Sequence, residues 1–347
     1  MKPELILHIG TEKTGTSTIQ AFLSRNRAVL RPAGVLAPRL MHRPRAVRLA
    51  ACCDVPPWPL AGRHFAVDSQ AALEDLRGET LKRLDARLAD RPYSRVVISN
   101  EHFHSLVRSP AQLDWLQEVV SSRFDGVRVV VYFRRQDRLA VSRWSTSLRA
   151  GFVSKDPFQF GPGVHHYFSH LGVYRLWSEV FGRDRMTVRL FERERFAGGN
   201  VLDDFLDAAG LPRGLAYQPA PVINEALSAD AAAVLTEFNT RIIAGRLELS
   251  DRDRRATTGL VAARYPGPPR LPLRAHAETF YLGFAEENAA LQEELGLSSW
   301  FDDDFSMYPE RLDDVAQQAR ARWAVDELDR VFPILQEEIR LRRLAES

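Results

Sequence analysis

Hydrophobic positions in this chain form short runs of β-branched and aromatic residues, separated by longer stretches in which apolar residues recur every three or four positions. The short runs predict strands at residues 4–9, 95–99, 127–133 and 186–191. The longer stretches predict helices at residues 17–30, 71–89, 112–124 and 139–148. Strands that alternate with helices are typical of an α/β fold, in which helices flank both faces of a central, mostly parallel sheet.

The rest of the chain is predicted to be helical, because no further strand pattern follows the fourth one. Helical spacing recurs at residues 199–209, 228–243 and 280–295. It appears again from Arg311 onward, where Pro333 is expected to interrupt the helix. We find no repeat and no low-complexity linker. We therefore expect a single domain over residues 1–347, with a core at about 1–210 and a helical C-terminal portion at about 211–347.

Composition places the chain among globular proteins with local rather than global charge. Hydrophobic residues make up 45% of its 347 residues, which is ample for a packed core. Lys and Arg number 47 against 45 Asp and Glu, a net charge of +2. No nucleic-acid partner or membrane surface is indicated by so small a charge. Any anion must therefore be bound by a local group of residues.

The cysteines and the apolar runs bear on the cellular compartment. Cys52 and Cys53 are adjacent and the chain has no others, so they offer neither a disulfide framework nor a set of zinc ligands. The first apolar run is too short for a secretory signal, and no stretch approaches membrane-spanning length. We therefore expect a cytoplasmic protein without an integral membrane segment.

The segment HIGTEKTGTSTIQ (8–20) follows the first predicted strand and leads into a helix that starts near Ser17. A helix start leaves its first amides without carbonyl partners and carries partial positive charge, so a turn rich in glycine and threonine there suits a phosphate. Gly10 and Gly15 permit sharp turns, and Lys13 adds a cation. Hydroxyl groups come from Thr14, Thr16, Ser17 and Thr18. The alternative interpretation is an ordinary strand-to-helix turn rich in capping residues.

The position of the lysine distinguishes this loop from that of ATP-binding proteins. A Walker A motif has four residues between its glycines, and a lysine directly after the second glycine. Gly10 and Gly15 have the correct spacing, but Thr16 stands at the lysine position. Lys13 lies inside the loop instead. A kinase or ATPase is therefore the less favoured interpretation.

Ligands of open parallel sheets bind beyond the carboxyl ends of the strands, so the residues that follow each strand are candidate site residues. The second strand is followed by Asn100, Glu101 and His102. The third is followed by Arg134 and Arg135, with Ser142 on the next helix. Guanidinium groups and a hydroxyl suit a second phosphate. For Arg138, Arg143 and Arg149 we favour a solvated helix face. The loop of Lys13 and the strand end at Arg134 are thus two places that suit a phosphate. Together they predict a nucleotide with phosphates at two separate positions.

Three stretches of the chain resemble the sulfotransferases that use 3′-phosphoadenosine 5′-phosphosulfate (PAPS), especially the bacterial carbohydrate-type branch. IGTEKTGTSTIQ is similar to the family's 5′-phosphosulfate loop. VVVYFRRQDRLAVSRW is similar to its 3′-phosphate motif, in which an arginine precedes a serine by eight positions, as Arg134 precedes Ser142. WSEVFGRDRMTVRLFERERFAGGNVLDDFLDAAGLP is similar to the segment after the nucleotide core in bacterial members. The likeness covers roughly the first two thirds of the chain.

The resemblance implies a P-loop NTPase-like fold and transfer of a sulfonyl group to a hydroxyl or amine, as in a saccharide or glycan precursor, without a catalytic metal. It implies that Lys13 stabilises the leaving 5′-phosphate, and that Arg134 and Ser142 hold the 3′-phosphate. The cofactor-binding residues that it implies are Gly10, Thr11, Lys13, Thr14, Gly15, Thr16, Ser17, Thr18, Arg134 and Ser142. A catalytic base is expected at Glu101, which we favour, or at His102. A carboxylate facing the dipole at a helix start is the alternative role for Glu101.

Two other functions stay open at this point. They are a P-loop-like kinase or NTPase, and a non-catalytic protein that binds the 3′,5′-bisphosphate and transfers nothing. The basic stretch at residues 39–48 is expected to be a solvated loop or to line an acceptor cleft for an anionic glycan. His104 is expected to be structural or to lie at the surface. Acceptor identity, adenine contacts and oligomeric state have no signal in the sequence.

Overall fold

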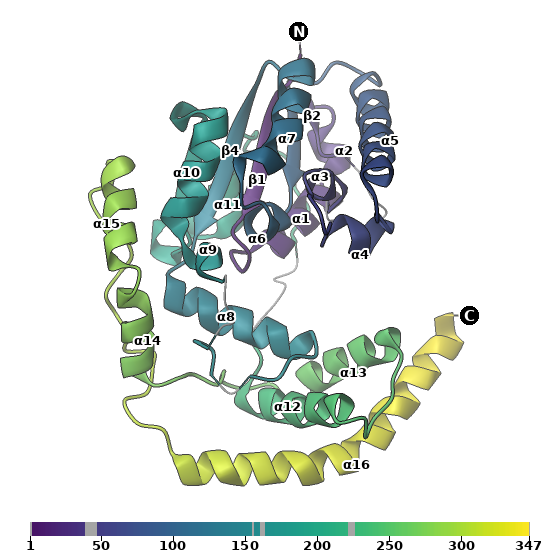
Figure 1. The fold of residues 1–347 in the computed structure, drawn as a ribbon, viewed down its shortest axis with the longest axis vertical. Coiled ribbons are helices and arrows are strands. Elements are labelled where there is room, and N and C mark those ends of the chain that lie inside the picture. The colour runs from purple at the N-terminus through teal and green to yellow at the C-terminus, as the bar shows by residue number, and fades with distance from the viewer. Residues whose placement is uncertain (1, 39–46, 155, 160–163, 221–225, 347) are drawn as a thin grey trace. The chain divides into compact units, whose positions relative to one another are not determined.

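A computed structural model describes residues 2–38, 47–154, 156–159, 164–220 and 226–346. Within these residues lies a five-stranded sheet of order β2-β3-β1-β4-β5, in which every neighbouring pair is parallel (Figure 1). The strands are β1 (Glu4–Gly10), β2 (Val35–Leu36), β3 (Arg95–Ser99), β4 (Gly126–Phe133) and β5 (Met186–Leu190). The predicted α/β class, with a parallel sheet flanked by helices, is therefore confirmed.

The inner strands form where they were expected because each is a short apolar run that is buried on both faces. In β1, for example, Leu5, Ile6 and Leu7 are at most 1% exposed. The edge strand β2 was not predicted. It has only two residues, which pair with Arg95 and Val96 of β3, and so short a strand carries no periodic pattern.

The chain divides into two compact units. The first comprises Met1–Arg135, Gly163–Asn224 and Ala285–Phe301, and the second comprises Gln136–Pro162, Glu225–Phe284 and Asp302–Ser347. Each unit therefore contains segments from before and after residue 210. The expected division into a core at about 1–210 and a helical portion at about 211–347 stays a prediction. The range 280–295, predicted as one helix, contains a boundary between the units and forms two helices.

The first unit holds the sheet and its covering helices. They are α1 (Thr16–Arg25), α2 (Arg27–Leu30), α3 (Val47–Cys52), α4 (Ala61–Phe65), α5 (Gln70–Leu88), α6 (His102–Leu106), α7 (Pro110–Arg123), α9 (His165–Phe168), α10 (His170–Phe181), α11 (Val201–Ala208) and α15 (Ala285–Glu294). Helices α1 and α11 pack on one face of the sheet, and α6, α7 and α10 lie on the opposite face (Figure 1). Both faces are thus covered, as a parallel sheet requires.

The predicted helix at residues 17–30 is wrong in one respect, because the structure breaks it into α1 and α2. The break falls at Asn26, whose side chain is fully buried. Its amide nitrogen donates to the carbonyl oxygens of Phe22, at 2.9 Å, and Gln218, at 3.0 Å. Its amide oxygen accepts from the backbone nitrogen of Gln218 at 2.7 Å. These bonds to a segment distant in sequence explain why local periodicity did not locate the break.

The second unit is helical, as expected for the later part of the chain. Its helices are α8 (Gln136–Arg149), α12 (Ala229–Ile243), α13 (Asp251–Arg264), α14 (Arg274–Leu282) and α16 (Asp314–Glu346). The expected interruption at Pro333 is wrong, because α16 continues through it. Leu328 and Val331 before the proline and Leu335 after it are all buried in one core cluster with α12. Packing on both sides of the proline therefore keeps the helix continuous.

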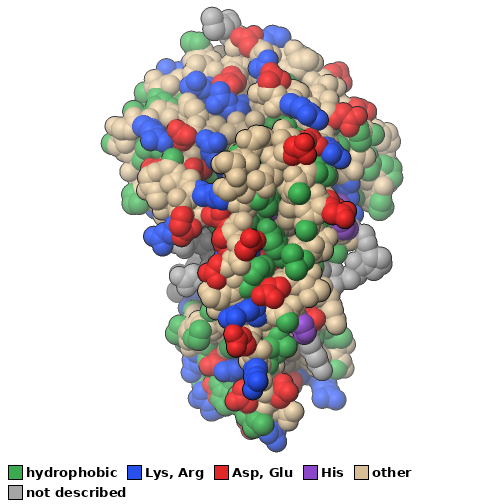
Figure 2. All heavy atoms as spheres, turned by 90° about the vertical axis from the view of Figure 1, so that its left-hand side faces the viewer, with side chains coloured by type: hydrophobic (Ala, Val, Ile, Leu, Met, Phe, Trp, Pro, Cys, Tyr) green, Lys and Arg blue, Asp and Glu red, His purple; other side chains and the backbone are tan. Residues whose placement is uncertain are grey.

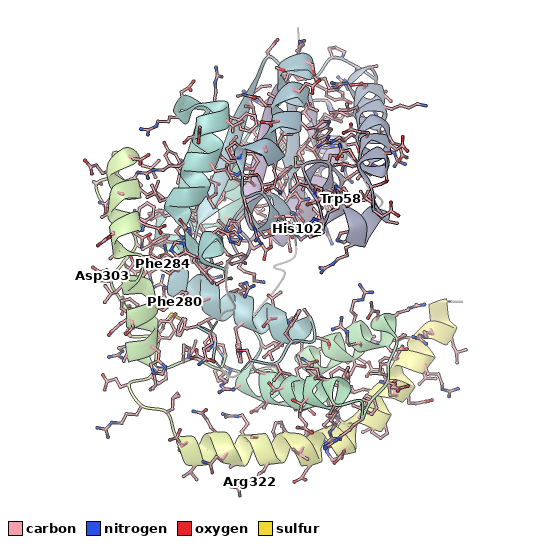
Figure 3. All side chains as sticks on the ribbon, viewed as in Figure 1. Trp58, His102, Phe280, Phe284, Asp303 and Arg322 are labelled. Atoms are coloured by element: carbon pink, nitrogen blue, oxygen red, sulfur yellow. The ribbon has the colours of Figure 1, made fainter. Side chains whose placement is uncertain are left out.

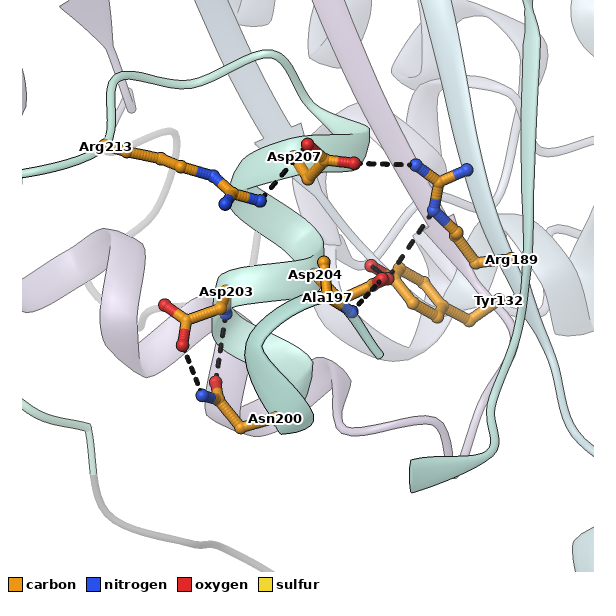
Figure 4. A network of polar contacts seen from close by, with 8 residues as sticks. All are labelled: Tyr132, Arg189, Ala197, Asn200, Asp203, Asp204, Asp207 and Arg213. Carbon is orange, nitrogen blue, oxygen red and sulfur yellow. Dashed lines mark hydrogen bonds and ion pairs between the residues drawn. The ribbon is translucent and has the colours of Figure 1, made fainter. Parts of the chain in front are cut away.

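A buried polar network joins β4 to α11 in the first unit (Figure 4). The Tyr132 hydroxyl donates to one oxygen of the Asp204 carboxylate at 2.6 Å, and the Ala197 amide donates to the other at 3.0 Å. Arg189 lies 3.7 Å from Asp204 and 3.1 Å from Asp207. Burial, followed by the bond to Asp204, raises the pKa of the Tyr132 hydroxyl, which stays a donor. The network fixes Tyr132, whose backbone holds the loop after β1.

Replacing Asp204 by alanine is expected to lower the free energy of unfolding by about 2–4 kcal/mol, because the buried Tyr132 hydroxyl and Ala197 amide lose their acceptor. Asp207 lies one turn further along the same helix and makes only exposed ion pairs with two arginines. Asp207→Ala is therefore expected to cost less than about 1 kcal/mol. Urea unfolding followed by circular dichroism compares the two variants, and equal losses would contradict the role of the network.

Candidate functional site

The loop after β1 is held at its base by the neighbouring strand β4. The backbone nitrogen and the hydroxyl of Thr11 both donate to the carbonyl oxygen of Tyr132, each at 2.9 Å. The Thr14 hydroxyl then donates to the carbonyl oxygen of Thr11 at 2.6 Å. Both threonines are fully buried. Their side chains therefore build the loop itself, which leaves backbone amides, Lys13 and the later hydroxyls to meet a ligand.

The backbone of the loop turns through left-handed conformations at three positions. Gly10 has φ 101° and Gly15 has φ 75°, and Lys13 has φ 67° although it carries a side chain. A Cβ atom at Gly10 would lie 3.1 Å from the backbone nitrogen of Glu12, so no larger residue fits without displacement. Left-handed backbone at a residue such as Lys13 costs about 1–2 kcal/mol. Turns of this kind direct successive amides into one concave space, which suits an anion.

Helix α1 begins at the end of this loop without a side-chain cap. Its N-cap residue is Gly15, which has no side chain to cap the helix, and its first turn contains no acidic residue. A helix start of this kind presents amides and the positive end of the helix dipole to whatever lies before it. The arrangement suits an anion, with Ser17 partly exposed and Thr16 and Thr18 nearly buried, and the phosphate cradle expected from the sequence stays a prediction.

Arg134 joins the loop from the carboxyl end of β4. Its guanidinium donates to the carbonyl oxygen of Lys13 at 2.9 Å and lies over the Phe191 ring, 5.7 Å from the centroid. Its own carbonyl oxygen accepts from His170 at 2.9 Å. The structure thus brings together Lys13 and Arg134, which lie 121 residues apart. A guanidinium group held against the backbone of this loop adds positive charge there, which favours an anion.

Two other residues were predicted to act with Arg134. Arg135 is 1% exposed, so its side chain is in the interior of the protein. Ser142 lies on α8, which belongs to the second unit. Its proposed role at a 3′-phosphate therefore stays a prediction that rests on its spacing from Arg134.

Glu101 lies against the loop at the carboxyl end of β3. A Cβ atom built on Gly10 would be 3.4 Å from its Cα atom, so the two backbones are in close contact. The Glu101 side chain is 8% exposed and accepts a hydrogen bond from the Gln20 amide of α1. As the N-cap residue of α6, Glu101 makes no side-chain bond to the first amides of that helix. The side chain of Asn100 instead accepts from the His102 amide at 2.8 Å. The bond from Gln20 holds the Glu101 carboxylate against α1.

His102 begins α6, where Figure 3 labels it. It is more exposed than the other base candidate, Glu101, which is buried. Its Nδ1 atom lies 4.0 Å from a carboxylate oxygen of Glu12, and each side chain is 24% exposed. The other Glu12 oxygen accepts from the Tyr167 hydroxyl at 2.9 Å. Neither Glu12 nor Tyr167 was predicted from the sequence as a site residue. Glu12 was visible as an acidic residue beside Lys13, whereas Tyr167 is 155 positions away and gave no signal.

His104 is structural, one of the two roles expected for it. It is 1% exposed, and burial lowers its pKa to about 3, so the ring is neutral. It accepts from the backbone nitrogen of Glu12 at 3.4 Å and, through its other ring nitrogen, bonds to the carbonyl oxygen of Tyr167 at 3.1 Å. His104 therefore links the loop to α9.

The described residues contain neither a metal-binding group nor a membrane-spanning helix. Among them, no group of histidine, cysteine and carboxylate side chains is arranged to hold a metal ion. No helix in the described ranges is both long and apolar enough to cross a lipid bilayer. On the face drawn in Figure 2, acidic and basic side chains are interspersed with apolar ones, as the small net charge leads us to expect.

Comparisons with known proteins give two similarities. No family model matches the chain. An uncharacterized protein of Archaeoglobus fulgidus is 29% identical over 128 residues, which are 37% of this chain and 33% of that protein. The chain thus spans about a third of this curated relative. The crystal structure of a sulfotransferase from Alicyclobacillus acidocaldarius is similar over 75% of this chain and 96% of that one, with 14% identity and a TM-score of 0.42. So loose an overlap does not assign a function to this chain.

The buried histidines of the first unit predict a loss of stability in mild acid. Burial lowers the pKa of His8 to about 4, and that of His104 and His170 to about 3. Since these rings titrate near pH 6.5 when unfolded, the unfolded state binds more protons below about pH 6.5, and the free energy of unfolding falls as the pH drops toward the folded-state values.

Urea titrations at about pH 7.5, 6 and 5 measure this dependence. His104→Asn removes one of the titrating groups and is expected to flatten the slope between about pH 6.5 and 4.5. Equal stability at the three pH values would show that the buried rings are not held neutral.

Proposed function

We propose that this chain is a PAPS-dependent sulfotransferase, which moves a sulfonyl group to a hydroxyl or amine of a saccharide or glycan precursor. The observation that carries the proposal is the hydrogen bond from Arg134 to the carbonyl oxygen of Lys13. It joins the two segments that separately suit a phosphate, at the carboxyl ends of adjacent strands. A nucleotide with both a 5′- and a 3′-phosphate fits two such cationic places better than a linear triphosphate.

The loop and α1 are proposed to hold the 5′ end of the nucleotide. Backbone amides between Thr14 and Thr18 would bind the 5′-phosphate, with the Thr16, Ser17 and Thr18 hydroxyls beside them. The Lys13 side chain would neutralise the charge that develops on the bridging oxygen as it leaves. Arg134 would orient the nucleotide through its 3′-phosphate, and Ser142 is proposed to add a hydroxyl there.

Transfer would proceed by in-line attack of the acceptor oxygen or nitrogen on sulfur. A bond forms from that atom to sulfur, the bond from sulfur to the 5′-phosphate oxygen breaks, and the acceptor's proton passes to a base. Adenosine 3′,5′-bisphosphate and the sulfated acceptor are the products. Glu101 is the first candidate base, because it lies against the loop at Gly10 and is oriented by Gln20. His102, beside Glu12, is the second.

A kinase or NTPase is less well supported by the same residues. Thr16 occupies the position where a Walker A lysine would reach the terminal phosphates. The lysine of this loop instead sits at a left-handed turn, with its carbonyl oxygen bonded to Arg134. A protein that binds the bisphosphate without transfer would have no use for Glu101 and His102, two groups able to accept a proton, at the end of β3. We therefore favour the enzyme.

Calorimetric titration with adenosine 3′,5′-bisphosphate and with ATP plus Mg²⁺ tests the proposal. We expect the bisphosphate to bind at least tenfold more tightly than ATP. Lys13→Ala and Arg134→Ala are each expected to weaken bisphosphate binding about tenfold or more, since each removes a charged contact worth about 1.5–3 kcal/mol.

Two variants serve as controls in this titration. Lys82→Ala removes the same charge from the exposed face of α5 and is expected to bind like the wild type. Glu101→Gln is also expected to bind normally, because its proposed role is in the transfer step. Tight ATP binding with no response to the bisphosphate would refute the proposed function.

A further inference from the structure

A cavity of about 160 Å³ lies within the second unit, beside the start of α14. Its wall is mostly apolar, with leucines, prolines and the Trp144 ring, and its polar lining residues are Asp156, Arg270 and His276. A cavity of about 150 Å³ in an apolar core can hold a benzene ring. This cavity therefore admits a small organic molecule, and an apolar wall with a few polar groups is typical of a ligand site.

Arg270 is the half-buried cation of this cavity. Its guanidinium lies over the Trp144 ring, 5.6 Å from the centroid, and donates to the Gln317 side chain at 3.4 Å. Among the described residues, no carboxylate forms an ion pair with Arg270. Burial, and then the nearby charge of Arg320, lower the pKa of its guanidinium. A guanidinium group has more N–H donors than these contacts use, so donors remain for an anionic group of a ligand.

Asp156 places the opposite charge in the same cavity. One of its carboxylate oxygens accepts from the Phe158 amide at 2.8 Å, and no described residue donates to the other. Asp156 is near enough to Arg270 to oppose the lowering of its pKa, yet these two described residues do not form an ion pair. The cavity thus holds a carboxylate and a guanidinium that are separated rather than joined, which leaves a place for a ligand that contacts both.

The start of α14 adds positive potential to the wall of the cavity. Its N-cap residue is Leu273, which lines the cavity and whose side chain makes no cap bond, and its first turn contains no acidic residue. The positive end of a helix dipole stabilises a negative charge beside it. Together with Arg270, this helix start favours a carboxylate group in the ligand.

The composition of the wall selects among small ligands. A simple anion would meet the Asp156 carboxylate and a simple cation would meet the Arg270 guanidinium, so each would be repelled by one of the two. A sugar carries hydroxyl groups around its whole ring, and those that face leucine and proline would lose their hydrogen bonds to water without replacement. A ligand with both charges at one end and an apolar group at the other matches every part of the wall. Free α-amino acids with an apolar side chain have this form.

We infer that this cavity binds a free α-amino acid with an apolar side chain of the size of leucine or phenylalanine. The carboxylate of the amino acid binds Arg270, its ammonium group binds Asp156, and its side chain packs against Leu271 and Leu273. The inference does not rest on the proposed sulfonyl transfer, and either can fail without the other. The cavity shares no lining residue with the basic stretch at residues 39–48, expected to line an acceptor cleft or to be solvated, most of which lies outside the described residues.

Calorimetric titration of the full chain with L-leucine and L-phenylalanine tests this inference. We expect at least one of them to bind with a Kd of about 1 mM or lower. Isocaproate and hydrocinnamate lack the ammonium group of these amino acids, and isoamylamine and phenethylamine lack the carboxylate. Each analogue is expected to bind about tenfold more weakly than its parent, because it loses one charged hydrogen bond. Glycine, which lacks the side chain, and methyl glucoside, a sugar, are expected to bind more weakly still.

Asp156→Asn and Arg270→Gln are each expected to weaken this binding about tenfold. Asparagine keeps the oxygen that accepts from the Phe158 amide, so the first variant removes the charge without removing that bond. It decides the test should Arg270→Gln fail to fold. Its matched control is Asp304→Asn, because Asp304 accepts from the Ser306 amide in the same way, at 2.7 Å, and does not line the cavity.

The controls are expected to change the binding less than twofold. They are Asp304→Asn and, for the arginine, Arg322→Gln, which removes an exposed charge from α16. Three results would overturn the inference. The first is a Kd above about 1 mM for both amino acids. The second is an analogue, glycine or methyl glucoside that binds as tightly as the amino acid, and the third is an equal effect of the cavity variants and their controls.

Discussion

The carbonyl oxygen of Tyr132 is the point on which the site depends. It accepts both the amide and the hydroxyl of Thr11 and so determines where the chain leaves β1. Tyr132 is itself fixed through its side chain by Asp204 of α11. A buried network on one face of the sheet thus holds at its edge the loop that we propose binds the nucleotide, so residues away from the proposed ligand set the position of those that would contact it.

Three separate connections then hold the loop in a strained conformation. Arg134 bonds to the carbonyl oxygen of Lys13, Tyr167 bonds to the Glu12 carboxylate, and His104 accepts from the Glu12 amide. The left-handed backbone at Lys13 is maintained because its neighbours are bonded from β4, α6 and α9. A cradle that is formed before its ligand arrives loses little conformational entropy on binding, which favours affinity for an anion.

The sequence predicted the parts of this structure that depend on local pattern. The inner strands are continuous apolar runs, and the loop of Lys13 and the arginine at the end of β4 both follow such runs directly, so their place at the sheet edge could be inferred. Contacts between distant segments left no pattern. The pairing of Glu12 with Tyr167, the bond between Gln20 and Glu101, and the continuity of α16 through Pro333 all depend on tertiary packing.

A crystal structure of the chain with adenosine 3′,5′-bisphosphate tests the central claim most directly. We expect the 5′-phosphate to lie within hydrogen-bond distance of the amides between Thr14 and Thr18, with the Lys13 ammonium beside it and the 3′-phosphate at Arg134. A bisphosphate bound away from this loop, or bound with its 5′-phosphate pointing away from Lys13, would contradict the claim that the loop and Arg134 together recognise a nucleotide at both its 5′ and 3′ ends.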